Sequence, residues 1–86
     1  MYRIRTYPDA AEQIEALSYD ALTLYTQVRA VLELVPWNGS PYAEDKPDGN
    51  MRQFFFGPSG QGFVIYLILE DQQLVDVLRV VWLDWP

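Results

Sequence analysis

Three apolar runs separated by short turns, between residues 51 and 83, constrain the fold of this chain most strongly. Met51–Phe56 is followed by the turn sequence GPSGQG, and Phe63–Glu70 is apolar at nearly every position. Asp71-Gln72 then reverses the chain into a last run, Leu74–Leu83. Runs rich in β-branched and aromatic residues predict strands, and connections this short join antiparallel neighbours. We therefore predict an antiparallel meander whose middle strand is covered on both faces.

An alternating segment, Tyr2–Tyr7, opens the sequence. Its two-residue period predicts a strand with Arg3 and Arg5 on the same face. Pro8 ends this strand, and a proline also suits the first turn of a helix. We predict that helix over residues 9–17, with its glutamates facing outward.

A second helix is predicted from Tyr19 to the residue before Pro36, with Ser18 as its N-cap. One apolar stripe runs along it at three- and four-residue steps, which is typical of a helix that packs on a sheet. The stripe is formed by Leu22, Tyr25, Val28, Leu32 and Val35. Residues 36–50 contain three prolines and two glycines and predict a loop, long enough to be functional or mobile.

The predicted order of elements is βααβββ. The economical arrangement is an α+β fold with a helical hairpin packed on one face of a four-stranded, mainly antiparallel sheet. A chain of 86 residues makes one domain, spanning residues 1–86. The residues that we expect to be largely buried are Leu22, Val28, Leu32, Ile65, Leu67, Val77 and Val80.

Composition excludes several kinds of chemistry. The chain has no cysteine and no histidine, so it has no thiolate nucleophile, no zinc-thiolate site and none of the commonest general base. We expect no metal and no other cofactor. Its net charge of −6 disfavours nucleic acid, the ribosome and mRNA included, because non-specific binding rests on lysine and arginine contacts to phosphate.

The sequence gives no sign of a membrane segment. The longest apolar runs are far shorter than the ~18 residues that a spanning helix needs. Polar and apolar residues alternate over Met1–Arg5, unlike the apolar region of a secretory leader. We therefore expect a cytoplasmic protein with no membrane partner.

Three basic or aromatic residues on predicted strands are the candidate catalytic residues: Arg52, Tyr66 and Arg79. A charged residue inside an apolar strand is costly if it is buried without a partner. Arg79 is therefore expected to pair with Asp76 or Asp20, or to reach solvent. Two interpretations stay open: a satisfied ion pair or exposed edge, and an anion site on the open sheet face.

The end of the sequence, VVWLDWP, is unusually apolar for the end of a small domain. Tryptophan is enriched at the buried centres of interfaces, so Trp82 and Trp85, together with Trp37, are candidate partner-binding residues. The alternative is that Trp82 continues the core and Trp85 folds back over the helices. The partner is either another protein, for which the negative net charge favours a basic segment, or a second copy of this chain.

The order of elements and several short motifs resemble the RelE/ParE superfamily of small bacterial toxins, which are made beside an antitoxin. The likeness covers essentially the whole chain. Its motifs are Met1-Tyr2-Arg3-Ile4 followed by Pro8-Asp9-Ala10, Leu32-x-x-x-Pro36-Trp37, Arg52 followed by Phe54 and Phe56-Gly57, Phe63-Val64-Ile65-Tyr66, and Val77-Leu78-Arg79-Val80.

The resemblance implies a toxin-like protein neutralised by a cognate antitoxin that carries a helix-turn-helix or a basic segment. Many members cleave mRNA on the ribosome, and ParE-type members act on DNA gyrase. For RNA cleavage, Arg52 and Arg79 would hold transition-state charge and Tyr66 would move a proton. The alternatives are a catalytically lapsed binding or regulatory module and a gyrase-directed toxin. The sequence departs from the nucleases at two places. Where they often carry a Tyr-Arg pair, this chain has Phe63-Val64. Where they typically have a basic tail, this chain has Trp82-Leu83-Asp84-Trp85.

Overall fold

The computed structural model describes residues 1–83 and confirms the predicted α+β order of elements, with one added strand. Two short 3₁₀ helices lie in the connections. In chain order the elements are β1 (Arg3–Thr6), α1 (Pro8–Glu15), α2 (Tyr19–Leu34), η1 (Pro36–Asn38), β2 (Ser40–Pro41), β3 (Met51–Phe56), β4 (Gly62–Leu69), η2 (Glu70–Gln72) and β5 (Leu74–Trp82).

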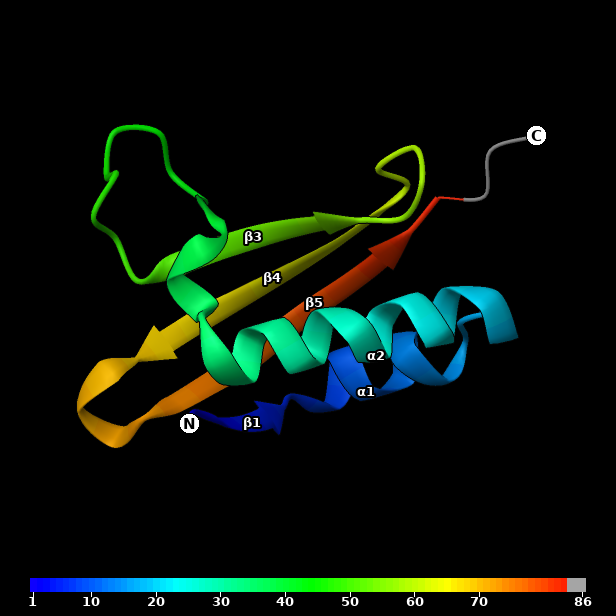
Figure 1. Cartoon of the computed structure of the whole chain (residues 1–86), viewed down its shortest axis with the longest axis horizontal. Helices are drawn as coiled ribbons and strands as arrows, with labels where there is room; N and C mark the ends of the chain where they lie inside the picture. The colour runs from blue at the N-terminus through cyan, green and yellow to red at the C-terminus, as the bar shows by residue number, and fades with distance from the viewer. Residues whose placement is uncertain (84–86) are drawn as a thin grey trace.

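The strands form one five-stranded sheet in the order β1-β5-β4-β3-β2 (Figure 1). The meander β3-β4-β5 is antiparallel, as predicted, and β1 pairs with β5 in parallel. The prediction of four strands was short by one, because the two-residue β2 pairs with Arg52 and Gln53 from within the expected loop. Pro41 can occupy this place because an edge strand leaves one row of N–H positions unused.

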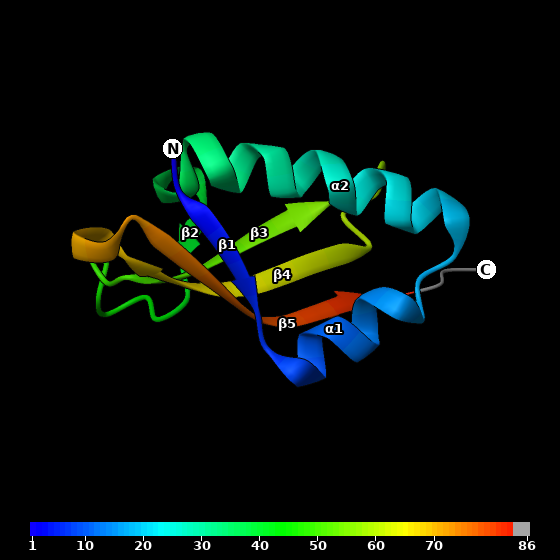
Figure 2. The same ribbon diagram turned by 90° about the horizontal axis from the view of Figure 1, so that it is seen from below.

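The two helices take different positions against the sheet. α2 lies across one face, whereas α1 lies beside the second half of β5, past the end of β1 (Figure 2). There the Gln13 side-chain oxygen accepts a hydrogen bond of 2.7 Å from the backbone N–H of Val80. α1 thus satisfies part of the β5 edge that β1 is too short to pair. No helix within residues 1–83 lies over the opposite face of the sheet.

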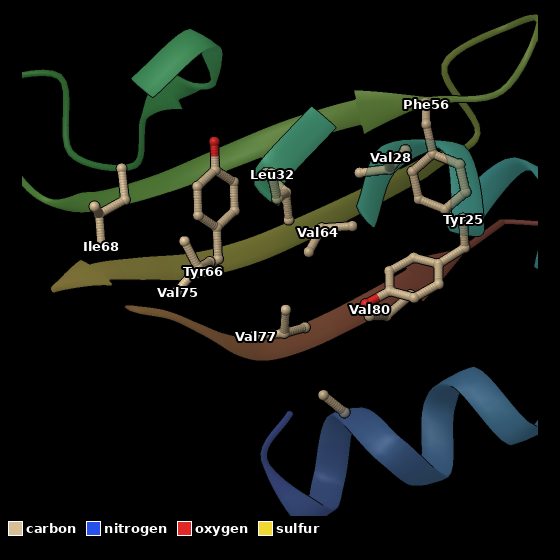
Figure 3. Packing of buried hydrophobic residues seen from close by; sticks show 11 residues of the cluster. Tyr25, Val28, Leu32, Phe56, Val64, Tyr66, Ile68, Val75, Val77 and Val80 are labelled. Carbon is tan, nitrogen blue, oxygen red and sulfur yellow. The ribbon is translucent and has the colours of Figure 1, made fainter. Parts of the chain in front are cut away.

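The hydrophobic core fills the space between α2, α1 and the covered face of the sheet (Figure 3). Tyr25 from α2 packs against Phe56 from β3, with ring centroids 6.3 Å apart. Ala10 is the residue that α1 buries in this core. The other members are Val28, Leu32, Val64, Tyr66, Ile68, Val75, Val77 and Val80.

Four of the seven predicted core residues are confirmed: Val28, Leu32, Val77 and Val80. The prediction that Leu22 is buried is wrong, because 38% of its surface is exposed. Tyr25, Val28 and Leu32 of the predicted stripe are buried, but Ala21 takes the place of Leu22 at its start, and Val35, past the end of α2, is exposed. Because only one stripe of the helix faces the core, an apolar side chain beside that stripe stays partly exposed.

Ile65 and Leu67 are also corrected, because both are only half-buried. Along β4 burial alternates strictly, with Val64, Tyr66 and Ile68 buried between them. The prediction that β4 is covered on both faces is therefore wrong within the described chain: α2 reaches one face only.

The start of α2 matches the prediction. Ser18 is the N-cap of α2, and its hydroxyl oxygen accepts a hydrogen bond of 3.3 Å from the Ala21 N–H. This bond satisfies one of the free N–H groups at the helix start. Within residues 1–83, no helix has the length and apolar character to cross a membrane.

Candidate functional site

Arg52 lies on the covered face and holds the loop that follows α2. Its guanidinium donates hydrogen bonds to three backbone carbonyls: Gly49 at 3.0 Å, Gly39 at 3.0 Å and Pro47 at 2.9 Å. The side chain is buried. All three guanidinium nitrogens are thus used inside the molecule, and the charge organises residues 39–49 without facing solvent.

Tyr66 is the register partner of Arg52 on β4 and is fully buried. Its hydroxyl points towards the segment after α2 and donates a hydrogen bond of 2.6 Å to the carbonyl of Pro36 (Figure 3). Gly39 leaves room for this hydroxyl, since a Cβ atom there would overlap it. Burial raises the pKa of Tyr66 to about 12. The phenol is placed to anchor the loop, and no solvent-facing group of a substrate can reach it.

Trp37 lies above Arg52 at the edge of this cluster. The guanidinium carbon of Arg52 is 5.0 Å from the centroid of the indole ring, within cation–π range. The indole N–H donates a hydrogen bond of 2.7 Å to the Glu70 carboxylate, which also accepts one of 2.7 Å from the Tyr2 hydroxyl. These donors lower the pKa of Glu70. Trp37 is exposed but tied to the fold, and its partner-binding role stays a prediction.

Arg79 lies on the opposite side of the sheet from Arg52 and Tyr66. It is the register partner of Ile65, so it shares the face that α2 does not cover, and it is exposed. Within residues 1–83 it makes no ion pair, neither with Asp76 nor with Asp20. It lines a cavity of about 320 Å³ between β5 and the α1–α2 connection, together with Gln13 and Ser18.

The structure therefore does not bring the three predicted catalytic residues together. Arg52 and Tyr66 are neighbours on the covered face, and Arg79 stands alone on the other. Arg52 and Tyr66 are engaged by backbone carbonyls, so the geometry gives no support to one anion site built from all three. Within residues 1–83, no group of three His, Asp or Glu side chains is arranged to hold a metal ion.

An ion pair that sequence reasoning missed lies next to Arg79. Asp76 is 1% exposed, and Arg5 binds its two carboxylate oxygens at 2.6 and 2.9 Å. The Tyr7 hydroxyl donates to the same carboxylate at 3.5 Å. Arg5 and Asp76 are register partners on β1 and β5. The alternation of Tyr2–Tyr7 predicted the face of Arg5, but only the parallel pairing shows which acid it meets.

The uncovered face is mainly apolar. We call it the open face, and define it by the strand residues that alternate away from α2. They are Arg3, Arg5, Met51, Gln53, Phe55, Phe63, Ile65, Leu67, Leu69, Leu74, Asp76, Arg79 and Val81. Phe55 is 55% exposed, and its ring centroid lies 5.9 Å from that of Phe63. The sequence analysis expected one face of the sheet to be open, but it did not predict that this face is apolar, because the apolar run of β4 indicated a strand covered on both sides.

Trp82 belongs to the covered face. Its ring lies 5.6 Å from that of Phe56 between centroids, and it packs half-buried against the core. This arrangement agrees with the alternative in which Trp82 continues the core, and its partner-binding role stays a prediction. Trp85 lies outside the described residues.

Several solved structures have the same arrangement of helices and strands as this chain. A chain of the intact E. coli RelBE toxin–antitoxin complex superposes with a TM-score of 0.79 at 11% identity, covering 99% of this chain and 100% of that one. The isolated E. coli RelE toxin gives a TM-score of 0.74 at 14% identity, over 100% and 88% of the two chains. The chain has the RelE fold.

The RelE fold extends to a mycobacterial structure as well. A chain of the toxin–antitoxin complex RelBE2 from Mycobacterium tuberculosis gives a TM-score of 0.74 at 20% identity, over 95% of this chain and 98% of that one. No family model and no curated protein sequence matches the chain. The likeness is therefore one of backbone, at sequence identities of 11 to 20%.

Proposed function

We propose that this chain is the toxin-like component of a bacterial toxin–antitoxin pair and is neutralised by a cognate antitoxin. The observation that carries the proposal is the match of the RelE fold over 99% of this chain and 100% of a chain from the RelBE toxin–antitoxin complex. The proposal predicts a partner protein for a chain that is small and strongly acidic.

The open face supports a role in binding another protein. Contiguous exposed apolar surface is uncommon on soluble monomers and usually marks an interaction site. Phe55, which is exposed, and the half-buried Phe63, Ile65 and Leu67 form an apolar surface of this kind on neighbouring strands. A toxin held by an antitoxin needs a surface of this kind.

A second candidate, a catalytically lapsed binding module, is favoured by the placement of Arg52 and Tyr66. RNA cleavage needs groups that move a proton and groups that hold phosphate charge. Arg52 and Tyr66 are satisfied inside the molecule, which leaves Arg79 as the unpaired candidate among the three. mRNA interferase activity would therefore depend on Arg79 and on residues that we did not predict.

Growth of bacteria that express the chain tests the toxin role. We expect growth arrest on induction of the chain alone, and growth close to that of uninduced cells when the product of the adjacent gene is expressed with it. A variant that cannot fold, Val64→Asp in the core, serves as the control for expression burden. Equal growth with the parent chain and with Val64→Asp would contradict the toxin role.

The Arg79→Ala variant separates cleavage from binding. If the chain cleaves mRNA, Arg79→Ala should abolish growth arrest and transcript cleavage mapped by primer extension, whereas Arg29→Ala on α2 should not. If growth arrest persists in Arg79→Ala without transcript cleavage, the toxin acts by binding a protein. Gyrase supercoiling activity measured in the same cells then shows whether gyrase, the target of ParE-type toxins, is that protein.

A further inference from the structure

Charged groups lie along two sides of the open face, with apolar side chains between them. In the sheet order β1-β5-β4-β3-β2, β1 and β5 form one side of this face. Arg3 on β1 and Arg79 on β5 are exposed, and neither makes an ion pair within residues 1–83. Arg5 and Asp76 neutralise each other at 2.6 Å. This side thus carries two positive charges, on a protein whose net charge is −6.

The opposite side of the open face is acidic. Beyond β2, at the far edge of the sheet from Arg3, the loop of residues 42–50 carries three carboxylates and one lysine, which gives a net charge of −2. The exposed carboxylates are those of Glu44, Asp45 and Asp48. The loop borders the open face, because Tyr42 and Lys46 line a cavity of about 180 Å³ together with Met51 of that face.

A surface with this distribution of charge is complementary to itself. A two-fold interface places the same surface on both copies, so a uniformly charged face would repel itself. A two-fold axis that runs along β4 exchanges the two sides, and the basic side of one copy then faces the acidic loop of the other. An axis across the strands, near Leu67, would instead bring Arg3 close to Arg79 of the second copy, because the two arginines lie on adjacent strands.

We propose that the open face is the interface of a homodimer, in which two sheets pack face to face about a two-fold axis along β4. Sheets packed in this way lie roughly 10 Å apart, with their strands within about 30° of each other. The inference does not rest on the toxin role, since it concerns what covers the open face when the chain is alone. A partner protein that binds this face competes with the second copy.

The register of the strands shows which apolar residues meet. The axis exchanges β3 and β5, the two neighbours of β4. Phe63 on β4 pairs with Phe55 on β3 and with Val81 on β5. Phe55 of one copy therefore packs against Val81 of the other, and Phe63 lies next to its own copy at the axis. Phe55 is 55% exposed in the single chain, so it has the most surface to bury.

A polar contact follows from the same register. Ile65 pairs with Gln53 on β3 and with Arg79 on β5. The guanidinium of Arg79 in one copy therefore faces the side-chain amide of Gln53 in the other, and its N–H groups can donate to the amide oxygen. The contact occurs twice in the dimer.

Arg3 falls opposite the acidic loop of the second copy. It is in register with Leu74, which pairs with Leu69. Met51 directly follows the loop and pairs with Leu67, two residues before Leu69. The end of the loop therefore lies level with Arg3 along the strands. Exchange of the two sides brings the loop carboxylates to the Arg3 guanidinium, within the range of about 8–10 Å over which charges act in salt.

The size of the open face predicts a weak dimer. β4 has eight residues, or a length of roughly 26 Å, and four strands span roughly 19 Å. Each copy thus offers a flat area on the order of 500 Å², to which the loop adds. Stable interfaces bury about 800 Å² on each partner. We therefore expect a dissociation constant of about 10 to 100 μM.

Sedimentation equilibrium of the purified chain measures this association. Phe55→Asp should raise the dissociation constant roughly tenfold or more, whereas Leu22→Asp, at an exposed apolar position on α2, should leave it unchanged. A parent chain that stays monomeric up to about 0.5 mM would overturn the proposal and leave the open face to a different protein. A dimer that Phe55→Asp does not weaken would overturn it as well.

Exchange of charges tests the direction of the two-fold axis. Arg3→Glu should raise the dissociation constant roughly tenfold, because two contacts in each dimer become repulsive. Glu44→Lys with Asp45→Lys, added to Arg3→Glu, should restore the parent value. The matched control combines the same loop changes with Arg29→Glu on α2, which gives the same net charge and should not restore it. Equal association of the two combined variants would contradict the contact between Arg3 and the loop.

Introduced thiols test which strands face each other, since the chain has no cysteine of its own. Gln53→Cys and Arg79→Cys chains, one of them with an affinity tag, are mixed and treated with a thiol crosslinker whose spacer matches the roughly 10 Å between packed sheets. We expect the mixed adduct to exceed both homodimeric adducts, and Leu22→Cys to give no adduct. A Gln53→Cys homodimeric adduct that exceeds the mixed one would place β3 against β3 and overturn the proposal.

Discussion

Alternate side chains of β4 are all large and mainly apolar but lie in two different environments. Towards α2, Tyr66 and Ile68 are 0% and 1% exposed, whereas Ile65 and Leu67 point to the open face and are half-buried. The covered face is closed by Leu32 and other α2 residues, and within residues 1–83 no helix closes the open face. An apolar strand residue thus indicates that a surface becomes covered, but it does not show by what.

The largest expected difference between the two faces is in the effect of truncating the two isoleucines of β4. Ile68→Ala should lower the free energy of unfolding by about 3 to 4 kcal/mol, because it leaves a cavity in a packed core. Ile65→Ala should cost about 1 kcal/mol, since its side chain is already partly in water. Urea unfolding measures both. Equal losses would show that the open face is packed as tightly as the covered one.

The two strand arginines give the next largest contrast. Arg52→Ala should destabilise the chain by about 2 to 4 kcal/mol, because three carbonyls lose a charged donor. Arg79→Ala should change stability by less than about 0.5 kcal/mol. Arg52→Lys should not restore the loss, since an ammonium cannot match the guanidinium fork. Urea unfolding and amide hydrogen exchange over residues 39–49 measure the effect.

A near-zero effect of Arg52→Ala, with unchanged exchange in the loop, would contradict the structural role of the guanidinium. Arg52 would then become a candidate for function again, together with Arg79.

The smallest expected effect is a pH dependence at Glu70, where the covered face meets the β4–β5 turn. Hydrogen bonds from Trp37 and Tyr2 lower the pKa of Glu70 in the folded chain below its ordinary value of 4.5. A lowered folded pKa contributes stability above the unfolded pKa, and this contribution is lost as pH falls through the folded value. The free energy of unfolding of Glu70→Gln should therefore be lower than that of the parent chain at neutral pH, and the two should approach each other below about pH 4.

Urea unfolding at a series of pH values measures this convergence. Asp71→Asn removes a carboxylate from the same turn that accepts no side-chain hydrogen bond within residues 1–83, and serves as the charge control. Trp37→Phe removes one donor and should reproduce part of the Glu70→Gln effect. If the difference in the free energy of unfolding between the parent chain and Glu70→Gln stays constant with pH, the role of the ionised carboxylate is contradicted.

Sequence patterns predicted the elements wherever a strong period was present. The strand over Met51–Phe56 has the predicted bounds, and β5 ends one residue early. β2 has two residues, one of them a proline, so no periodic signal could reveal it. The place of α1 beside the β5 edge depends on the shortness of β1, which is visible only once the pairing is known.

The candidate site was harder to predict than the fold. Polar residues inside apolar strands identified Arg52 and Arg79 as unusual, but the groups that satisfy Arg52 are backbone carbonyls of a loop, which the sequence does not show. The partner of Asp76 is Arg5, 71 residues away in the chain. The apolar character of the open face escaped prediction because an apolar strand is the same in sequence whether a helix or a partner covers it.

Photo-crosslinking in cells tests most directly whether the open face is where the antitoxin binds. A photoreactive amino acid replaces either Phe55 on the open face or Leu22 on α2, both exposed apolar positions, in cells that also express the adjacent gene product. We predict a covalent adduct between the chain and that gene product from position 55 and none from position 22, with the adduct identified by mass. An adduct from position 22 and none from position 55 would contradict the open face as the antitoxin-binding surface.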